Sequence, residues 1–312
     1  MRKDLGFRVG TGLFGALLIL IVSSIGFELT RQSMLSIQKF GLAFWTSSTW
    51  DPVAGEFGAL PFIWGTLYSS VLALLIATPV AIGIAVFITE LCPPVLRQPL
   101  VFLTELLAAI PSIVYGLWGI FVLVPAVRWF QTSLPDSLRA LPIFSGPPLG
   151  VGMLSATLIL AVMVVPFTSS VAREVLKSVP VAQREAAYAL GATRFEAISA
   201  ALFYARTGIV GAVMLGFGRA LGETMAVTMV IGNNPQVSAS LFAPQYTMAA
   251  VLANEFTEAA DELYLHALIE IGLVLFVITL VVNGFSRLLI WSMARTSKPA
   301  RVAPPASAAV QA

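Results

Sequence analysis

The chain has 312 residues, of which 58% are hydrophobic and only 11% are charged, and its formal net charge is +2. Soluble domains carry roughly 25% charged residues, so this composition excludes an ordinary soluble protein and indicates a surface that largely faces lipid. The single cysteine, Cys92, excludes an intrachain disulfide, and the single histidine, His266, has no Cys or His companion with which to hold a metal.

Six apolar segments follow one another along the chain, and each is long enough to cross a hydrocarbon core of roughly 30 Å. We expect them at residues 9–27, 65–90, 100–124, 151–172, 208–232 and 263–293. Pro79, Pro111 and Pro166 interrupt three of them, which a packed membrane bundle tolerates. The sequence therefore predicts an all-α fold, a polytopic membrane helical bundle with six transmembrane helices.

The spans divide the chain into four regions. Residues 1–28 hold a basic start and the first span, which we expect to stay uncleaved because no A-x-A-like site follows it. Residues 29–64 form an extramembrane loop that contains several tryptophans. Residues 65–293 hold the other five spans and a long polar loop at 173–206, and residues 294–312 form a tail rich in proline and alanine that we expect to be disordered.

Lysine and arginine are shared unequally between the two sides of the membrane, and this bias sets the orientation. Six spans place both termini on one side, and that side holds 13 basic residues, namely Arg2, Lys3, Arg8, Arg97, Arg173, Lys177, Arg184, Arg194, Arg206, Arg287, Arg295, Lys298 and Arg301. The other side holds 4, namely Arg31, Lys39, Arg128 and Arg139. The bias predicts cytoplasmic N- and C-termini, a cytoplasmic loop at 173–206 and a periplasmic loop at 29–64.

The cytoplasmic loop has the pattern of a short helix, a turn and a second helix. Pro180 suits the start of the first helix and Gly191 suits the left-handed residue at its end. Thr193 and Glu196 form a capping box that opens the next helix. The same outline is typical of DNA-binding modules, but membrane spans on both sides argue against a nucleic-acid partner. We therefore expect this loop to dock a partner protein.

The remaining basic residue, Arg219, lies in the middle of the fifth predicted span. A charge at the centre of a span costs about 2.5–3.5 kcal/mol even on a lenient scale, so it is normally paired and kept away from lipid. Glu223 follows at i+4, where both side chains would share a helix face. Gly218 and Gly222 form a GxxxG pair that allows another helix to approach closely.

Two interpretations of this charged pair compete. In the structural one, Arg219 and Glu223 neutralise each other and fix helix packing. In the functional one, the Arg219 guanidinium binds an oxyanion that crosses the membrane, while Glu223 sets the position of the guanidinium and tempers its affinity.

Other polar residues in or near the spans suggest weaker hypotheses. Glu105 and Glu270 lie within about two turns of predicted span ends, so we expect them at the interface. Five hydroxyl side chains beside Pro111 and Pro166 either line a path or bond backbone groups that the prolines free; they are Ser112, Tyr115, Thr168, Ser169 and Ser170.

The sequence contains no catalytic constellation. It lacks the G-x-x-x-x-G-K-[ST] loop that cradles ATP phosphates, a metal-spaced His/Cys set and the G-x-S-x-G motif. We therefore predict a protein that is not an enzyme, with no catalytic residue, no metal site and no cofactor. Uphill transport would draw its energy from a partner or from ion coupling.

With these residues in hand, the chain resembles the permease subunits of bacterial binding-protein-dependent ABC importers. The family's cytoplasmic signature is matched by Glu185, Ala186, Ala187 and Gly191. The family pattern usually continues to a proline that is absent here, since residues 201–204 read ALFY. Three further runs resemble the PstC-type permeases of the high-affinity phosphate importer: AAIPSIVYGL at 108–117, FSGPP at 144–148 and GRALGETMAV at 218–227.

The resemblance implies a type I ABC importer permease fold in the bacterial inner membrane. It also implies a heterodimer with a PstA-type permease, two PstB-type ATPase subunits and a periplasmic phosphate-binding protein, with Arg219 and Glu223 on the phosphate route. The loop at 173–206 would be the coupling loop to the ATPase. The alternatives are a permease for another oxyanion such as molybdate or sulfate, or an ion-coupled secondary transporter that uses Arg219, Glu223 and Glu270.

Overall fold

The structure, a computed structural model, describes residues 2–296 and is built from helices. Six of the described helical segments are long and apolar enough to cross a membrane, which confirms the predicted all-α bundle with six spans. They are Phe7–Gln32, Leu60–Leu91, Ser112–Ser133, Met153–Lys177, Arg194–Leu221 and Glu262–Met293. The predicted disordered tail lies outside the described residues from position 297 onward.

The helices occur in the following order along the chain. They are α1 (Arg2–Gln32), α2 (Met34–Phe40), α3 (Ala43–Thr46), α4 (Leu60–Val86), the π-helix η1 (Phe87–Leu91), α5 (Pro94–Ala109), α6 (Ser112–Trp118), the π-helix η2 (Gly119–Leu123), α7 (Val124–Ser133), α8 (Asp136–Arg139), the 3₁₀-helix η3 (Pro142–Phe144), α9 (Met153–Lys177), α10 (Val181–Ala189), α11 (Arg194–Leu221), α12 (Met225–Thr228), α13 (Met248–Glu255) and α14 (Glu262–Thr296).

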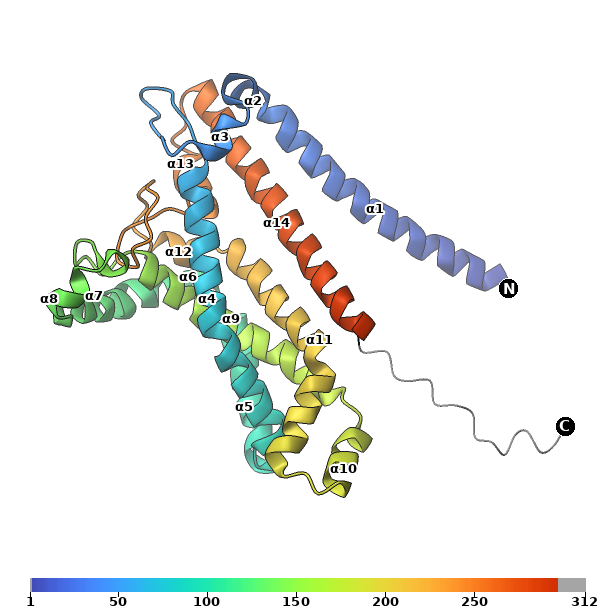
Figure 1. Ribbon diagram of the computed structural model, residues 1–312. Helices are drawn as coiled ribbons and strands as arrows, with labels where there is room; N and C mark the ends of the chain where they lie inside the picture. The colour runs from blue at the N-terminus through green and yellow to red at the C-terminus, as the bar shows by residue number, and fades with distance from the viewer. Residues whose placement is uncertain (1, 297–312) are drawn as a thin grey trace.

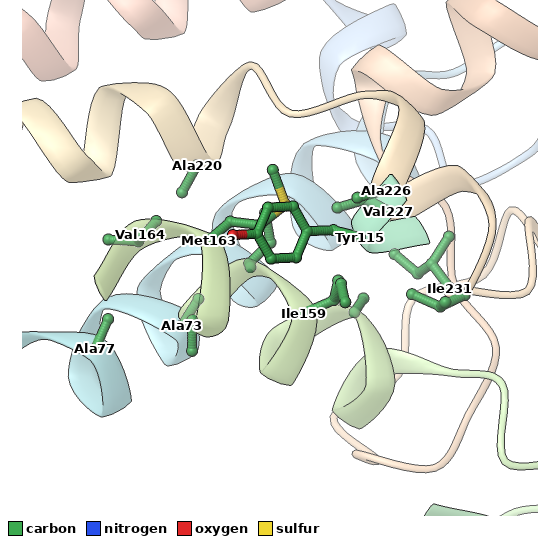
Figure 2. Close-up of a cluster of buried hydrophobic side chains, with 14 of the residues drawn as sticks. Ala73, Ala77, Tyr115, Ile159, Met163, Val164, Ala220, Ala226, Val227 and Ile231 are labelled. Atoms are coloured by element: carbon green, nitrogen blue, oxygen red, sulfur yellow. The ribbon is translucent and has the colours of Figure 1, made fainter. Parts of the chain in front are cut away.

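The bundle is organised around α9, whose most apolar window is 61% buried, against 28% or less for the other five spans. α4 packs along it through a stripe of small side chains at every fourth position. Ala73, Ala77, Ala81 and Ala85 of this stripe are all completely buried. Small residues at this spacing allow helix backbones to approach closely in a membrane. Figure 2 shows the middle of the resulting core, where Tyr115 lies among side chains of α4, α9, α11 and α12.

A second core lies at the end of the bundle that carries α2, α3 and α13 (Figure 1). Aromatic side chains fill it, and the Trp50 ring lies 4.8 Å from that of Phe62. Glu255 accepts hydrogen bonds from Trp50 Nε1 at 2.9 Å and from the Tyr264 hydroxyl at 2.6 Å. Burial raises the pKa of the Tyr246 hydroxyl, so this phenol stays neutral while it accepts a bond from Asn254. The predicted loop at 29–64 is thus largely ordered structure.

The third span differs from the prediction of residues 100–124. The chain is extended at Ile110 and Pro111, so α5 ends at Ala109 and the spanning segment is Ser112–Ser133. The physical reason is that a proline disfavours helical backbone in the residue before it. Pro79 and Pro166 lie inside α4 and α9 as predicted.

The fifth span also differs from its predicted position at 208–232. α11 runs without interruption from the Thr193 capping box to Leu221, and the apolar stretch beyond it belongs to the separate helix α12 and a loop. The predicted polar loop at 173–206 therefore shrinks to the residues between α9 and α11. Of the neighbouring helices, α1 ends at Gln32 and α4 begins at Leu60.

We predict that Gly65→Ala destabilises the protein. A Cβ atom at Gly65 would lie 2.1 Å from the carbonyl oxygen of Tyr246, and this backbone atom cannot rotate away. Overpacking of this kind costs about 1–3 kcal/mol or more, so the thermal unfolding midpoint in detergent should fall. Gly83→Ala in the same helix is the control, since nothing lies within 4 Å of its Cβ position. Equal midpoints for the two variants would contradict the close contact.

Candidate functional site

The first candidate region is α10, which lies at the end of the bundle opposite α2 and α3 (Figure 1). The capping box before α11 is present as predicted, with Glu196 N bonded to Thr193 Oγ1 and Thr193 N bonded to Glu196 Oε2. Gly191 ends α10 with φ +84°. The amides of Gly191 and Ala192 donate to the carbonyls of Tyr188 and Ala187, which is the Schellman pattern of a helix C-terminus.

The surface of α10 is largely exposed. Glu185, Ala186 and Gly191 are exposed and Ala187 is half-buried. Large apolar side chains around them are also exposed, at 65% for Val181, 51% for Tyr188, 90% for Leu190 and 78% for Phe195. A contiguous exposed apolar patch with charged residues beside it is typical of a protein-interaction site.

The second candidate region surrounds Arg219 in the last turn of α11. The Arg219 side chain is exposed, and its guanidinium carbon lies 5.7 Å from the centre of the Phe167 ring of α9. None of the ion pairs among the described residues joins Arg219 to Glu223, so the predicted pairing on one helix face is wrong. The reason is that α11 ends at Leu221, before it reaches Glu223.

Glu223 instead belongs to the break between α11 and α12. Its side chain is half-buried, and its carboxylate accepts a bond from the Ala226 amide at 3.4 Å, at the start of α12. Gly218 meets no atom within 4 Å at its Cβ position, and Gly222 meets only the Gly218 carbonyl oxygen at 4.0 Å. The GxxxG pair is therefore not a helix contact within the described chain. Gly216 takes that role, since its Cβ position lies 2.4 Å from Thr168 Oγ1.

The hydroxyl of Tyr115 has a structural role, which was one of its two predicted alternatives. It donates a hydrogen bond at 2.7 Å to the Leu107 carbonyl, the group that an N–H at position 111 would have bonded in a continuous helix. Because Pro111 has no N–H, the Tyr115 hydroxyl replaces that bond, beside a longer one of 3.4 Å from the Ile110 amide to the same carbonyl.

Sequence reasoning missed several charged contacts. Arg173, only 5% exposed, bonds Glu105 of α5 at 2.9 Å, so this ion pair links α9 to α5. Glu270, also expected at the interface, is 2% exposed. Arg184 of α10 pairs with Glu90 of η1 at 2.7 Å. In both ion pairs the partner is more than 60 positions away, and no local pattern in one sequence marks such a pair.

The two candidate regions can support two kinds of binding. The exposed Arg219 guanidinium near a helix break can form bidentate hydrogen bonds with an oxyanion, and no ion pair with Glu223 has to break first. An exposed short helix with an apolar rim can dock a second protein.

The chain has relatives among known proteins. Residues 77–295 match the model of the family described as binding-protein-dependent transport system inner membrane component. The chain is 45% identical to the phosphate transport system permease protein PstC of Mesorhizobium japonicum, over 91% of this chain and 89% of that protein. It is 47% identical to the PstC protein of Haemophilus influenzae, over 93% and 94%.

The chain is also similar to a more distant relative and to a solved structure. A probable PstC protein of Methanocaldococcus jannaschii is 38% identical, over 85% of this chain and 86% of that protein. The fold resembles a chain of the MetNI methionine ABC transporter in an inward-facing conformation, with a TM-score of 0.55, 14% identity and coverage of 74% and 94%. This likeness confirms the predicted type I importer permease fold.

We predict that Gly191→Ala frays the C-terminal end of α10. A Cβ atom would meet no neighbour there, so the effect isolates the left-handed backbone, which costs a non-glycine residue about 1–2 kcal/mol. Amide exchange at Gly191 and Ala192, measured by hydrogen–deuterium exchange in detergent, should accelerate roughly 5- to 30-fold. Gly191→Asn is the control, because asparagine tolerates this conformation. Unchanged exchange in the alanine variant would contradict the assignment.

Proposed function

Because this chain belongs to the family of binding-protein-dependent transport system inner membrane components, we propose that it is a permease subunit of an ATP-driven importer and forms half of the pathway for inorganic phosphate across the inner membrane. The observation that carries this proposal is the 45% identity, over 91% of the chain, to a phosphate transport system permease. The chain itself is then a transport component, and a partner subunit hydrolyses ATP.

Arg219 and Glu223 are the residues we assign to the phosphate route. Arg219 is exposed, and among the residues that the structure describes no carboxylate forms an ion pair with its guanidinium, which supports a role in attracting and bonding the anion. Glu223 acts on the same step from the other side of the helix break. Its negative charge weakens the hold on phosphate, and a site that held phosphate too tightly would trap it.

α10 is the element we assign to ATPase docking, through Glu185, Ala186, Ala187 and Gly191. The exposed apolar rim around these residues supports this assignment, because a partner groove would bury it. The complete importer would contain a second, PstA-type permease, two PstB-type ATPase subunits and a periplasmic phosphate-binding protein. ATP can shift the permease between states only by binding one of them better, and here it does so through the ATPase interface.

The orientation follows from the basic residues. With 13 of them on the side of α10 and the termini, and 4 on the other side, both termini and α10 lie in the cytoplasm. The end that carries α2, α3 and α13 then faces the periplasm, where the binding protein delivers phosphate.

We predict that Arg219→Gln abolishes phosphate uptake while the complex still assembles. Glutamine keeps hydrogen-bonding capacity but removes the charge that attracts the anion, and charge-assisted bonds are about twice as strong as neutral ones. The measurement is uptake of radiolabelled phosphate by vesicles that contain the whole complex, with ATPase copurification as the assembly check. Arg219→Lys should retain part of the uptake. Normal uptake by the glutamine variant would remove Arg219 from the route, whereas uptake of sulfate or molybdate in preference to phosphate would reassign the cargo.

A second prediction concerns docking. Glu185→Lys reverses an exposed charge on α10 and should reduce copurification of the ATPase subunit at least tenfold, because a buried like-charge contact costs several kcal/mol. Insertion of the permease in the membrane should be unchanged. Glu258→Lys makes the same reversal on an exposed glutamate at the opposite end of the bundle and should copurify like the natural chain. Normal copurification and transport with Glu185→Lys would show that docking does not depend on this residue.

A further inference from the structure

The way α10 is attached to the rest of the bundle carries an inference beyond docking. Arg184 projects from α10 to the end of the second span, where its Nε and Nη2 atoms bond Glu90 Oε1 at 3.1 and 2.7 Å. The same guanidinium donates to the carbonyls of Val179 and Leu176 at 3.0 and 3.1 Å. Leu176 lies in the last turn of α9, so one side chain ties together α9, α10 and η1.

Glu90 receives a second arginine from the other flank of α10. Arg194, the first residue of α11, donates from Nη2 to the Glu90 carbonyl oxygen at 2.5 Å. Glu90 is therefore held by its carboxylate from within α10 and by its backbone from the start of α11. The residue lies in η1, a π-helical turn, and such turns are frequent at functional sites.

The Arg184–Glu90 ion pair is largely shielded from solvent. The side chains of Arg184 and Glu90 are only 19% and 14% exposed. Removal of one partner from such a pair leaves the other charge poorly solvated and strongly destabilised. By contrast, the nearby pair between Lys177 and Glu174 is 48% and 60% exposed, and surface pairs of this kind contribute little. We therefore expect the Arg184–Glu90 pair to hold α10 to η1 firmly, and the Lys177–Glu174 pair to contribute little.

Glu90 lies near one end of the helical segment Leu60–Leu91, and the other end of this segment is also held by hydrogen bonds. We call this segment the rod. The segment Leu60–Leu91 contains 32 residues and would span about 48 Å as a helix. Near its far end, Trp64 Nε1 donates to the Ser238 carbonyl at 2.8 Å, and the Tyr68 hydroxyl donates to the Ala239 carbonyl at 2.9 Å. These carbonyls belong to the loop between α12 and α13, on the proposed periplasmic side. The rod therefore connects α10 directly to that outer loop.

We propose that Glu90 is the positioning residue through which movement of α10 is transmitted along α4 to the outer loop at 233–247. The proposal rests on the proposed function, since α10 must first dock the ATPase. A displacement of α10 pulls Arg184, Arg184 pulls Glu90, and the continuous helical segment Leu60–Leu91 moves Trp64 and Tyr68 with the loop carbonyls that they bond. Coupling of this kind needs a physical link between the two sites, and the hydrogen bonds above supply one.

The test uses the complete importer in lipid vesicles and compares the natural chain with Glu90→Gln and with the double variant Glu90→Arg/Arg184→Glu. We expect Glu90→Gln to keep the ATPase bound and hydrolysing ATP, but to move about tenfold fewer phosphate ions per ATP, as loss of a charged hydrogen bond predicts. The double variant restores the ion pair with reversed polarity but loses the Arg184 bonds to the Val179 and Leu176 carbonyls, so it should recover only part of the coupling. Lys177→Gln, which removes only the exposed pair, should be normal.

Hydrogen–deuterium exchange separates this proposal from docking itself. In the natural complex, α10 should be protected, and exchange in residues 233–247 should change when ATP is trapped on the ATPase. In Glu90→Gln, protection of α10 should persist and the response of the outer loop should be lost. A loop that still responds in Glu90→Gln, or a double variant no better coupled than the single one, would overturn the proposal. An unprotected α10 in the natural complex would overturn docking first, and this proposal with it.

Discussion

Every backbone N–H and C=O group inside a membrane must find a partner within the protein, because the hydrocarbon core supplies none. Two breaks in the spans of this chain show how side chains help to meet that constraint. At Pro111 the Tyr115 hydroxyl bonds the Leu107 carbonyl. Between α11 and α12, the Glu223 carboxylate accepts from the Ala226 amide, and the Thr228 hydroxyl bonds the Thr224 carbonyl. Polar side chains at the breaks are therefore required by the fold before they serve any transport role.

The same constraint explains why the helices can pack so closely. Lipid gives apolar helices no hydrophobic reason to associate, so contact depends on shape and on polar links. α4 and α9 meet through the buried alanine stripe, and Gly216 brings α11 against Thr168 of α9. Polar links then join elements far apart in the sequence, as Arg173 does to Glu105 and Arg184 does to Glu90. Small residues set the distance between helices, and these ion pairs fix their register at the end that carries α10.

Local signals in the sequence predicted most of the fold, while long-range contacts were hidden from it. The six spans, the Thr193–Glu196 capping box and the left-handed Gly191 follow from hydropathy and from residues a few positions apart. The breaks were misplaced, because apolar residues lie on both sides of 110–111 and 222–224, so each apolar stretch resembles one continuous span. At the candidate site, the sequence identified Arg219 and Glu223 as candidates. It did not predict that they would be separated, because the separation depends on where α11 ends. Glu90 could not be found, because its partners Arg184 and Arg194 lie about a hundred positions away.

The separation of Arg219 from Glu223 helps to explain how the proposed transport site could attract an anion and yet bind it only weakly. A guanidinium in a shielded pair with a carboxylate would have to break that pair before it met an anion. Here α11 ends first, and the guanidinium lies over the Phe167 ring instead. A cation–π contact at an exposed site is worth only about 0.5–1 kcal/mol, so a doubly bonded oxyanion can displace it. On the phosphate route proposed above, the guanidinium would return to the ring when the anion leaves. The break at Gly222 thus leaves Arg219 with a partner that an anion can replace, and this suits passage better than tight binding.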